Sequence, residues 1–344
     1  MYHQSRKMQS ISVVLFALII ACAATHLHHP PLEMLNFTLN GHQEWIQLYH
    51  VYKHPTDPIF ILISGSGSDY RPIIMSPDGV LLSDYLAMNG IQFYAPLFRG
   101  MSSESSPLNG SLFGIESMTN DTEIAVDHIL QMNPHAPGVV MFGDSLGGDV
   151  VIRYNSRHGV KRTLGMRNKL CGTIAQGGPY SSLALSFMPM LEQMASFPVD
   201  NLPVPLLFLN DTLALDSFAE LENEMTNYDL EFNSELKHEM YEHTFLVPIG
   251  PFKVDFSNFS RIMYDWEHTD VDVPMLVMNG YDEKVIDLPS TIDGFAAMPS
   301  ADKEMIIWGN GGHMVFWELA IYEKFRTVLI NRAKRMISLC TYEV

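Results

Sequence analysis

The chain has 344 residues, of which 47% are hydrophobic and 17% charged. This composition excludes a disordered or fibrous protein and fits one large domain with an insertion, or two small domains. The formal net charge of −18 argues against nucleic acid as a partner, because the chain would be repelled by a phosphate backbone.

The first segment has the layout of a secretory signal peptide. Arg6 and Lys7 precede an uncharged run over residues 11–24, which contains the small residues Ala-Cys-Ala at 21–23. We therefore predict a signal peptide over residues 1–23 and a secreted, extracytoplasmic mature chain. The uncharged run is shorter than the roughly 20 residues that a spanning helix needs, so no stable membrane span is expected in the mature chain. An uncleaved signal anchor is the minor alternative.

Glycosylation sequons and cysteines bear on the same route. Two cysteines, Cys171 and Cys340, stay in the mature chain and would meet an oxidising compartment. Their spacing matches no disulfide framework, so a disulfide and two unpaired thiols both stay open. The Asn-x-Ser/Thr sequons expected to carry glycans begin at Asn36, Asn109, Asn120, Asn210 and Asn258.

The pattern along the chain predicts an α/β fold. A hairpin comes first, because two alternating apolar stretches flank Asn40-Gly41, which favours positive φ. Short, fully apolar runs then alternate with helical segments, as in a doubly wound, mostly parallel sheet buried on both faces. The strands are expected at 59–63, 91–95, 139–142, 170–175, 275–278 and 305–308, and the helices at 80–88, 122–132 (with Asn120 as the potential cap), 146–156 and 315–336.

This alternation breaks in one long segment. Residues 179–269 are rich in Pro, Met and acidic side chains and show no strand–helix rhythm. We interpret them as a lid inserted over the sheet, with the core formed by residues 24–178 and 270–344. The Leu- and Met-rich stretch 183–194 could line an apolar pocket or could pack the lid on the core.

A nucleophile motif follows the third expected parallel strand. Residues 143–148 read Gly-Asp-Ser-Leu-Gly-Gly and lie between a predicted strand and a predicted helix, the setting of a Gly-x-Ser-x-Gly nucleophile elbow. Gly143 and Gly147 remove side chains that would collide at the sharp turn. Ser145 is therefore the candidate nucleophile.

A serine needs a base, and the base needs an acid to fix its tautomer. His313 follows the last predicted strand through a glycine-rich turn, and Asp282 follows the strand before it, so the order Ser, Asp, His is that of an α/β hydrolase. We predict His313 as general base and Asp282 as its orienting carboxylate. Glu283 and Asp287 are nearby rivals for that role.

Two backbone N–H groups are predicted to hold the oxyanion. One belongs to Leu146 at the start of the helix after Ser145, where N–H groups are unpaired. The other belongs to Ser66, in the glycine-containing loop after the strand 59–63. This chemistry needs no cofactor. A metal held by His26, His28 and His29 is not expected, because these residues lie in a flexible tail.

The motifs together resemble the α/β-hydrolase superfamily. Residues 64–69, 98–100 and 143–148 look like its esterase and serine-aminopeptidase branch with a lid, and residues 312–318 are similar to the end of proline-iminopeptidase-like hydrolases. Ser64 stands where a histidine is common, Asn279 where a glycine is usual, and Pro96-Leu97 replaces an acidic lead-in. These departures leave the triad intact and the subfamily open.

The expected function is therefore hydrolysis of a small-molecule ester or acyl substrate, a carboxylic ester or thioester, through an acyl-enzyme on Ser145. The first alternative is an aminopeptidase, which must anchor the substrate's ammonium group on a buried carboxylate. The second is a catalytically inactive hydrolase fold used as a binding module.

Overall fold

The computed structural model describes residues 27–39, 41–65, 70–101, 105–109, 114–163, 170–178, 203–204, 273–283, 286 and 288–341. The predicted signal peptide and nearly all of the predicted lid lie outside these residues. Among the described helices, none is both long and apolar enough to cross a membrane.

The core of the molecule is an eight-stranded sheet with the order β1-β2-β4-β3-β6-β7-β9-β10. The first two strands form the predicted hairpin, in which Leu39 pairs with His42 and Gly41 has φ 82°. β2 also pairs antiparallel with β4, and the strands from β4 to β10 are parallel to one another. The strands are β1 (Glu33–Leu39), β2 (His42–Val51), β3 (Ile59–Ile63), β4 (Gln92–Leu97), β6 (Val139–Asp144), β7 (Leu170–Gln176), β9 (Met275–Gly280) and β10 (Lys303–Trp308).

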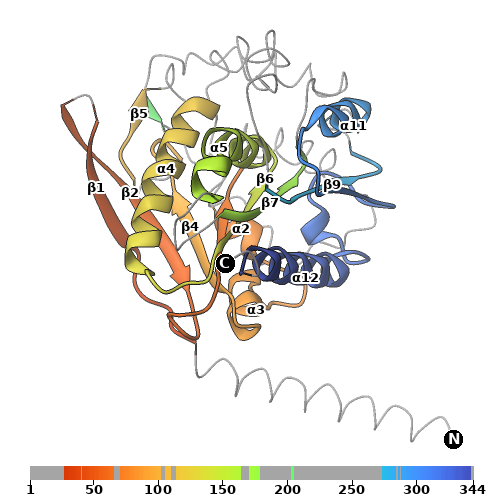
Figure 1. The fold of residues 1–344 in the computed structure, drawn as a ribbon, viewed down its shortest axis with the longest axis horizontal. Helices are drawn as coiled ribbons and strands as arrows, with labels where there is room; N and C mark the ends of the chain where they lie inside the picture. The colour runs from red at the N-terminus through yellow and green to blue at the C-terminus, as the bar shows by residue number, and fades with distance from the viewer. Residues whose placement is uncertain are drawn as a thin grey trace, which may run out of the picture.

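Helices cover both faces of this sheet (Figure 1). One face packs against α4 (Ile115–Met132), α5 (Leu146–Thr163) and α11 (Leu288–Ala297). The other face packs against α2 (Tyr70–Ile74), α3 (Leu82–Met88), the 3-10 turn η3 (Val315–Trp317) and α12 (Tyr322–Thr341). Two cores therefore flank the central strands, which explains why those strands are apolar without alternation. A separate short pair joins β5 (Leu108–Asn109) and β8 (Pro203–Val204).

The expected strands are all present, but several helices differ from expectation. Asn120 was predicted to cap a helix, whereas α4 begins at Ile115 and contains Asn120 in its second turn. The expected helix 315–336 is divided into η3 and α12. The short helices α2 and α11 were not predicted, and each contains a proline, which weakens a helical pattern.

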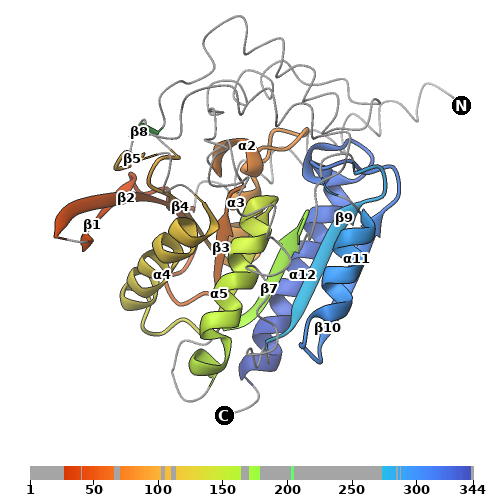
Figure 2. The ribbon, with the colours of Figure 1, turned by 90° about the horizontal axis from the view of Figure 1, so that it is seen from above.

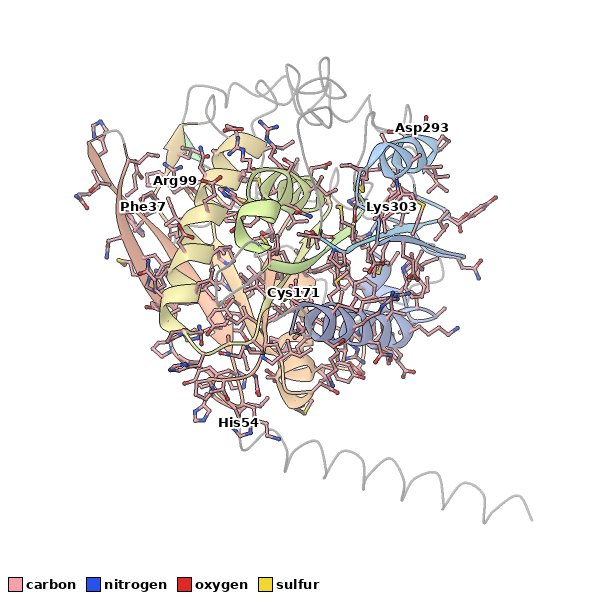
Figure 3. All side chains as sticks on the ribbon, viewed as in Figure 1. Phe37, His54, Arg99, Cys171, Asp293 and Lys303 are labelled. Carbon is pink, nitrogen blue, oxygen red and sulfur yellow. A yellow bond between two sulfur atoms is a disulfide. The ribbon has the colours of Figure 1, made fainter. Side chains whose placement is uncertain are left out.

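Polar contacts of Arg99 and Lys303, both labelled in Figure 3, fix two of the connections around the sheet. Arg99 in the loop after β4 forms a buried ion pair with Asp121 of α4, with 2.7 Å between Nη2 and Oδ1. Lys303 at the start of β10 donates through Nζ to the carbonyls of Phe295, Ala296 and Met298 at 2.9, 3.0 and 2.7 Å. A lysine at the end of a helix satisfies its last carbonyls, so α11 is held against β10.

A disulfide joins Cys171 in β7 to Cys340 in α12, with 5.3 Å between the two Cα atoms. Figure 3 labels Cys171 beside α12. Of the two states that the sequence left open for these cysteines, the structure has the disulfide. It attaches the last helix covalently to the middle of the sheet.

Candidate active site

Ser145 occupies the turn between β6 and α5. β6 ends at Asp144 and α5 begins at Leu146, so a single residue reverses the chain. Ser145 has φ 50°, a left-handed conformation that is uncommon for a residue other than glycine and costs free energy. Two hydrogen bonds hold it: its N–H donates to the Gln176 carbonyl, and the Gly148 N–H donates to its carbonyl, both at 2.8 Å. This is the geometry of a nucleophile elbow.

The glycines around the elbow are required by close backbone contacts. A Cβ on Gly143 would lie 2.0 Å from the Gly147 carbonyl oxygen, and a Cβ on Gly147 would lie 2.1 Å from the Ile63 carbonyl oxygen. Both distances are far below van der Waals contact, so neither position accepts a side chain without moving the backbone. The elbow is therefore packed in direct backbone contact with β3 and with the first turn of α5.

His313 forms a buried pair with Glu283. The distance between His313 Nδ1 and Glu283 Oε2 is 2.8 Å, and both side chains are fully buried. The two residues follow the neighbouring strands β10 and β9, which brings their loops to one edge of the sheet.

The structure corrects the expectation that Asp282 faces the histidine. Asp282 is exposed, and its backbone N–H donates to the Gly311 carbonyl at 2.9 Å. The carboxylate on His313 belongs to the next residue, Glu283, which the sequence had offered as a rival. Asp287, the other rival, lies outside the described residues.

The Nε2 atom of His313 is buried and has no hydrogen-bond partner among the described residues. Burial lowers the pKa of the imidazole, but the charge and hydrogen bond of Glu283 and the charge of Asp144 outweigh it, so the pKa is raised. A histidine with Nδ1 on a carboxylate and Nε2 unpaired has the arrangement of a general base.

Asp144 is a further buried acid that the sequence analysis did not single out. It immediately precedes Ser145, is 2% exposed, and its Oδ1 has no hydrogen-bond partner among the described residues. Burial raises the pKa of Asp144 to about 7; the charge of His313 lowers it and that of Glu283 raises it. The only sequence signal was its place as the first x of Gly-x-Ser-x-Gly. Asp144 and His313 interact through their charges, so the protonation of one depends on that of the other.

Two hydrogen bonds and the close approach of Gly177 hold the loop that carries His313. The Gln176 side chain donates from Nε2 to the His313 carbonyl at 2.6 Å, and the Gly312 N–H donates to Glu318 Oε1 at 2.5 Å. Gly177 has φ 65°, and a Cβ there would lie 3.1 Å from His313 Cε1. The end of β7 therefore packs directly against the histidine, and β7 itself lies between α5 and α12 (Figure 2).

The predicted oxyanion donors are described in part. Leu146 is the first residue of α5 and is buried, so its N–H lies at a helix N-terminus. Ser66 lies outside the described residues. The residue before it, Gly65, approaches the elbow so closely that a Cβ on it would lie 2.9 Å from Ser145 Cβ. The loop after β3 therefore reaches the nucleophile.

The remaining predicted sites fall in different places. Asn36 is exposed on β1, Asn109 is in β5, and Asn120 is half-buried in α4, where its Oδ1 accepts from Arg157 Nη1 at 3.3 Å. Asn210 and Asn258 lie outside the described residues. In the described part of the chain, no group of three or more His, Cys, Asp or Glu side chains is placed to hold a metal ion.

The fold and the elbow define the class of protein: the chain is an α/β hydrolase. The family model described as "Serine aminopeptidase, S33" matches residues 80–320, which is more than two thirds of the chain. The chain therefore belongs to this family. A search of curated protein sequences found no match.

Solved structures share the fold at low sequence identity. A monoglyceride lipase from Saccharomyces cerevisiae has a TM-score of 0.64 and 17% identity, covering 90% of this chain and 96% of the lipase. An esterase from a Rhodococcus species has a TM-score of 0.61 and 14% identity, covering 89% and 98%. A thermophilic esterase from Thermogutta terrifontis has a TM-score of 0.57 and 13% identity, covering 89% and 99%.

Proposed function

We propose that the chain is a secreted serine hydrolase that cleaves a carboxylic ester or thioester through an acyl-enzyme on Ser145. One observation carries this proposal, which is that Gln176 at the end of β7 bonds to both Ser145 and His313. Its backbone carbonyl accepts from the Ser145 N–H, and its side-chain Nε2 donates to the His313 carbonyl. The elbow therefore meets the loop that carries the histidine paired with Glu283. A strained serine and a histidine with a free Nε2 are the parts that nucleophilic acyl transfer needs.

In the proposed reaction, His313 Nε2 takes the proton of Ser145 Oγ as that oxygen attacks the carbonyl carbon of the substrate. The oxyanion formed is held by the N–H groups of Leu146 and Ser66, and His313 then protonates the departing alcohol or thiol. Water attacks the acyl-enzyme with His313 again as base, which releases the carboxylic acid and restores Ser145. Glu283, in place of Asp282, fixes the tautomer of His313 and stabilises its charged form.

Secretion is supported by two separate observations. The sequence over residues 1–23 has the order of a signal peptide, and five sequons follow it. The disulfide between Cys171 and Cys340 suits an oxidising compartment, because cytosolic thiols are kept reduced.

A second candidate is an aminopeptidase. The description of the matching family favours it, whereas the structural neighbours named above are a lipase and esterases. Both reactions would use the same serine and histidine, so the substrate's remaining groups decide between them. We favour the ester, because the stretch 183–194 is rich in Leu and Met, and apolar side chains of this kind suit an acyl group.

The test of Ser145 uses a matched pair of serine variants. Ser145→Ala should abolish p-nitrophenyl butyrate turnover and fluorophosphonate labelling, because it removes the attacking oxygen. Ser156→Ala alters a serine of α5, the helix that follows Ser145; its Oγ donates to the Arg153 carbonyl, and the variant should retain both activities. Labelling that persists in Ser145→Ala would refute the assignment. An unlabelled wild-type chain would favour the inactive binding module.

The substrate class is tested by comparing kcat/KM for p-nitrophenyl butyrate with the values for prolyl and alanyl aminomethylcoumarin. Esters should be cleaved better. Efficient release from the amides, lost on neutralising one lid carboxylate such as Glu192, would establish the aminopeptidase instead.

A further inference from the structure

We propose that the side chain of Gln176 is a positioning residue that sets where His313 stands relative to Ser145. The expected effect on kcat rests on the proposed function, whereas the expected effect on the position of His313 rests on the geometry alone. This role belongs to a residue outside the three that carry the chemistry.

Gln176 contacts both partners through different groups. Its backbone carbonyl accepts from the Ser145 N–H at 2.8 Å, and its side-chain Nε2 donates to the His313 carbonyl at 2.6 Å. Gln176 ends β7, and its strand neighbours in register are Asp144 of β6 and Met278 of β9. Gln176 therefore lies in the sheet between β6, which leads into the elbow, and β9, which leads into the loop of Glu283.

The side-chain contact lies in the buried interior of the protein. Gln176 is fully buried, and its Oε1 has no hydrogen-bond partner among the described residues. A buried amide that leaves its oxygen unpaired costs free energy, which a hydrocarbon side chain of the same size would avoid. For packing alone, an apolar residue would therefore stabilise the fold more than glutamine does. The hydrogen bond to the His313 carbonyl is the interaction that offsets the cost of burying the amide.

The contact between the Gln176 side chain and the His313 carbonyl can be removed without disturbing the elbow. Any residue at position 176 keeps the backbone carbonyl that holds Ser145, so a side-chain change acts on the His313 loop. Two acidic groups raise the pKa of the imidazole through their charge: Glu283, which is hydrogen-bonded to it, and Asp144 at the end of β6. A displaced ring would move relative to both, and its pKa would fall toward the ordinary value.

The test uses two isosteric variants of buried glutamines. Gln176→Met removes the donor and keeps the volume. Gln92→Met is the control, because Gln92 is 1% exposed and its Nε2 also donates to backbone carbonyls, those of Pro55 and Asp57, but from the first residue of β4. The start of β4 lies at the opposite end of the parallel strands from the elbow. Gln92→Met loses more hydrogen bonds than Gln176→Met, because Tyr94 Oη also donates to Gln92 Oε1 at 3.1 Å. The control should therefore lose at least as much thermal stability as Gln176→Met.

The first readout is the titration of His313, followed by NMR in protein carrying 15N-labelled histidine and assigned by the loss of its signal in His313→Gln. In Gln176→Met the pKa of His313 should fall relative to wild type, while Gln92→Met should titrate as wild type does. An unchanged titration in Gln176→Met would overturn the proposal. If Gln176→Met does not fold, Gln176→Asn, whose amide is one methylene short of the His313 carbonyl, is measured in the same way.

The second readout is ester hydrolysis well below the unfolding temperature of each variant. Misplacement of a catalytic group by about 1 Å can cost about 100-fold in rate, so kcat of Gln176→Met should fall at least about tenfold with KM within about twofold. Equal losses of kcat in Gln176→Met and Gln92→Met would mean that stability alone is at work and would also overturn the proposal. A wild-type chain without esterase activity, combined with the NMR shift, would refute the proposed function and support the positioning role.

Discussion

His313 Nδ1 lies 2.8 Å from Glu283 Oε2 inside the protein, while the neighbouring Asp282 is exposed. The sheet register accounts for the meeting of the pair, because Trp308 at the end of β10 is paired with Gly280 at the end of β9. The two loops leave adjacent strands at the same level. A histidine and a carboxylate so placed are mutually dependent for charge and orientation.

We therefore expect Glu283→Gln to reduce kcat by orders of magnitude, up to about 10⁴-fold, because the amide no longer fixes the required tautomer of His313. Asp282→Asn should leave kcat within a few-fold of wild type. Steady-state hydrolysis of p-nitrophenyl butyrate by the two variants measures both values. The opposite ranking would return the orienting role to Asp282.

Asp144 should set the pH dependence of the reaction. The base must be neutral to accept a proton, so activity should rise with pH through an apparent pKa above histidine's ordinary 6.5. Ionised Asp144 favours the charged form of His313, so Asp144→Asn should move the acid limb of kcat/KM to lower pH. A limb that stays in place, or moves to higher pH, would show that Asp144 does not act on His313.

The same carboxyl should make stability depend on pH. The pKa of Asp144 is raised from 3.8 to about 7, so the folded protein keeps a proton that the unfolded chain has released between those values. The free energy of unfolding therefore falls as pH rises through this window, and the full cost applies above it. Asp144→Asn should raise the Tm more at pH 8 than at pH 4. The control Asp302→Asn changes a half-exposed carboxylate and should show no such difference.

The disulfide should contribute strongly to stability. It closes a loop with a sequence separation of 169, for which the chain-entropy model gives up to about 5 kcal/mol. Cys340→Ser should lower the denaturant midpoint and make it insensitive to dithiothreitol, whereas the wild-type midpoint should fall on reduction. An equal midpoint for oxidised wild type and Cys340→Ser would mean that α12 is held by its apolar contacts alone.

The described sequons should differ in occupancy. Asn36 is exposed on an edge strand, and its sequon partner Thr38 is exposed as well. Asn120 is half-buried in a helix beside Arg157, and its sequon partner Thr122 is fully buried. In protein secreted from eukaryotic cells, Asn36→Gln should remove one glycan by mass spectrometry and Asn120→Gln none. A glycan on Asn120 would require the α4 surface to open.

The sequence predicted the elements whose patterns are set by burial alone. The central strands are enclosed on both faces, so their apolar runs are continuous and were found. The start of α4 was missed because its buried side is partly polar: Thr119, Asp121 and Thr122 are buried there, and Asp121 is paired with Arg99. A tertiary ion pair thus removed the periodicity that marks a helix.

The choice between Asp282 and Glu283 could not be made from sequence. Adjacent residues of a turn point in different directions, and only the path of the backbone decides which one faces His313. The pairing of Cys171 with Cys340 was undetermined for a similar reason, because the contact depends on how α12 crosses the sheet. Gly143 and Gly147, in contrast, were predictable, because a sharp strand-to-helix turn imposes the same crowding wherever it occurs.

The two cysteines that link β7 and α12 are synthesised at different times. Cys171 is synthesised 169 residues before Cys340, which at ordinary rates of translation is an interval of about 10 to 30 s. Throughout that interval the thiol of Cys171 has no native partner, and it can react with other cysteines or with an oxidoreductase. On the proposed secretory route, folding of the chain should therefore depend on an isomerase that protects or reshuffles that thiol until the ribosome has delivered the last helix.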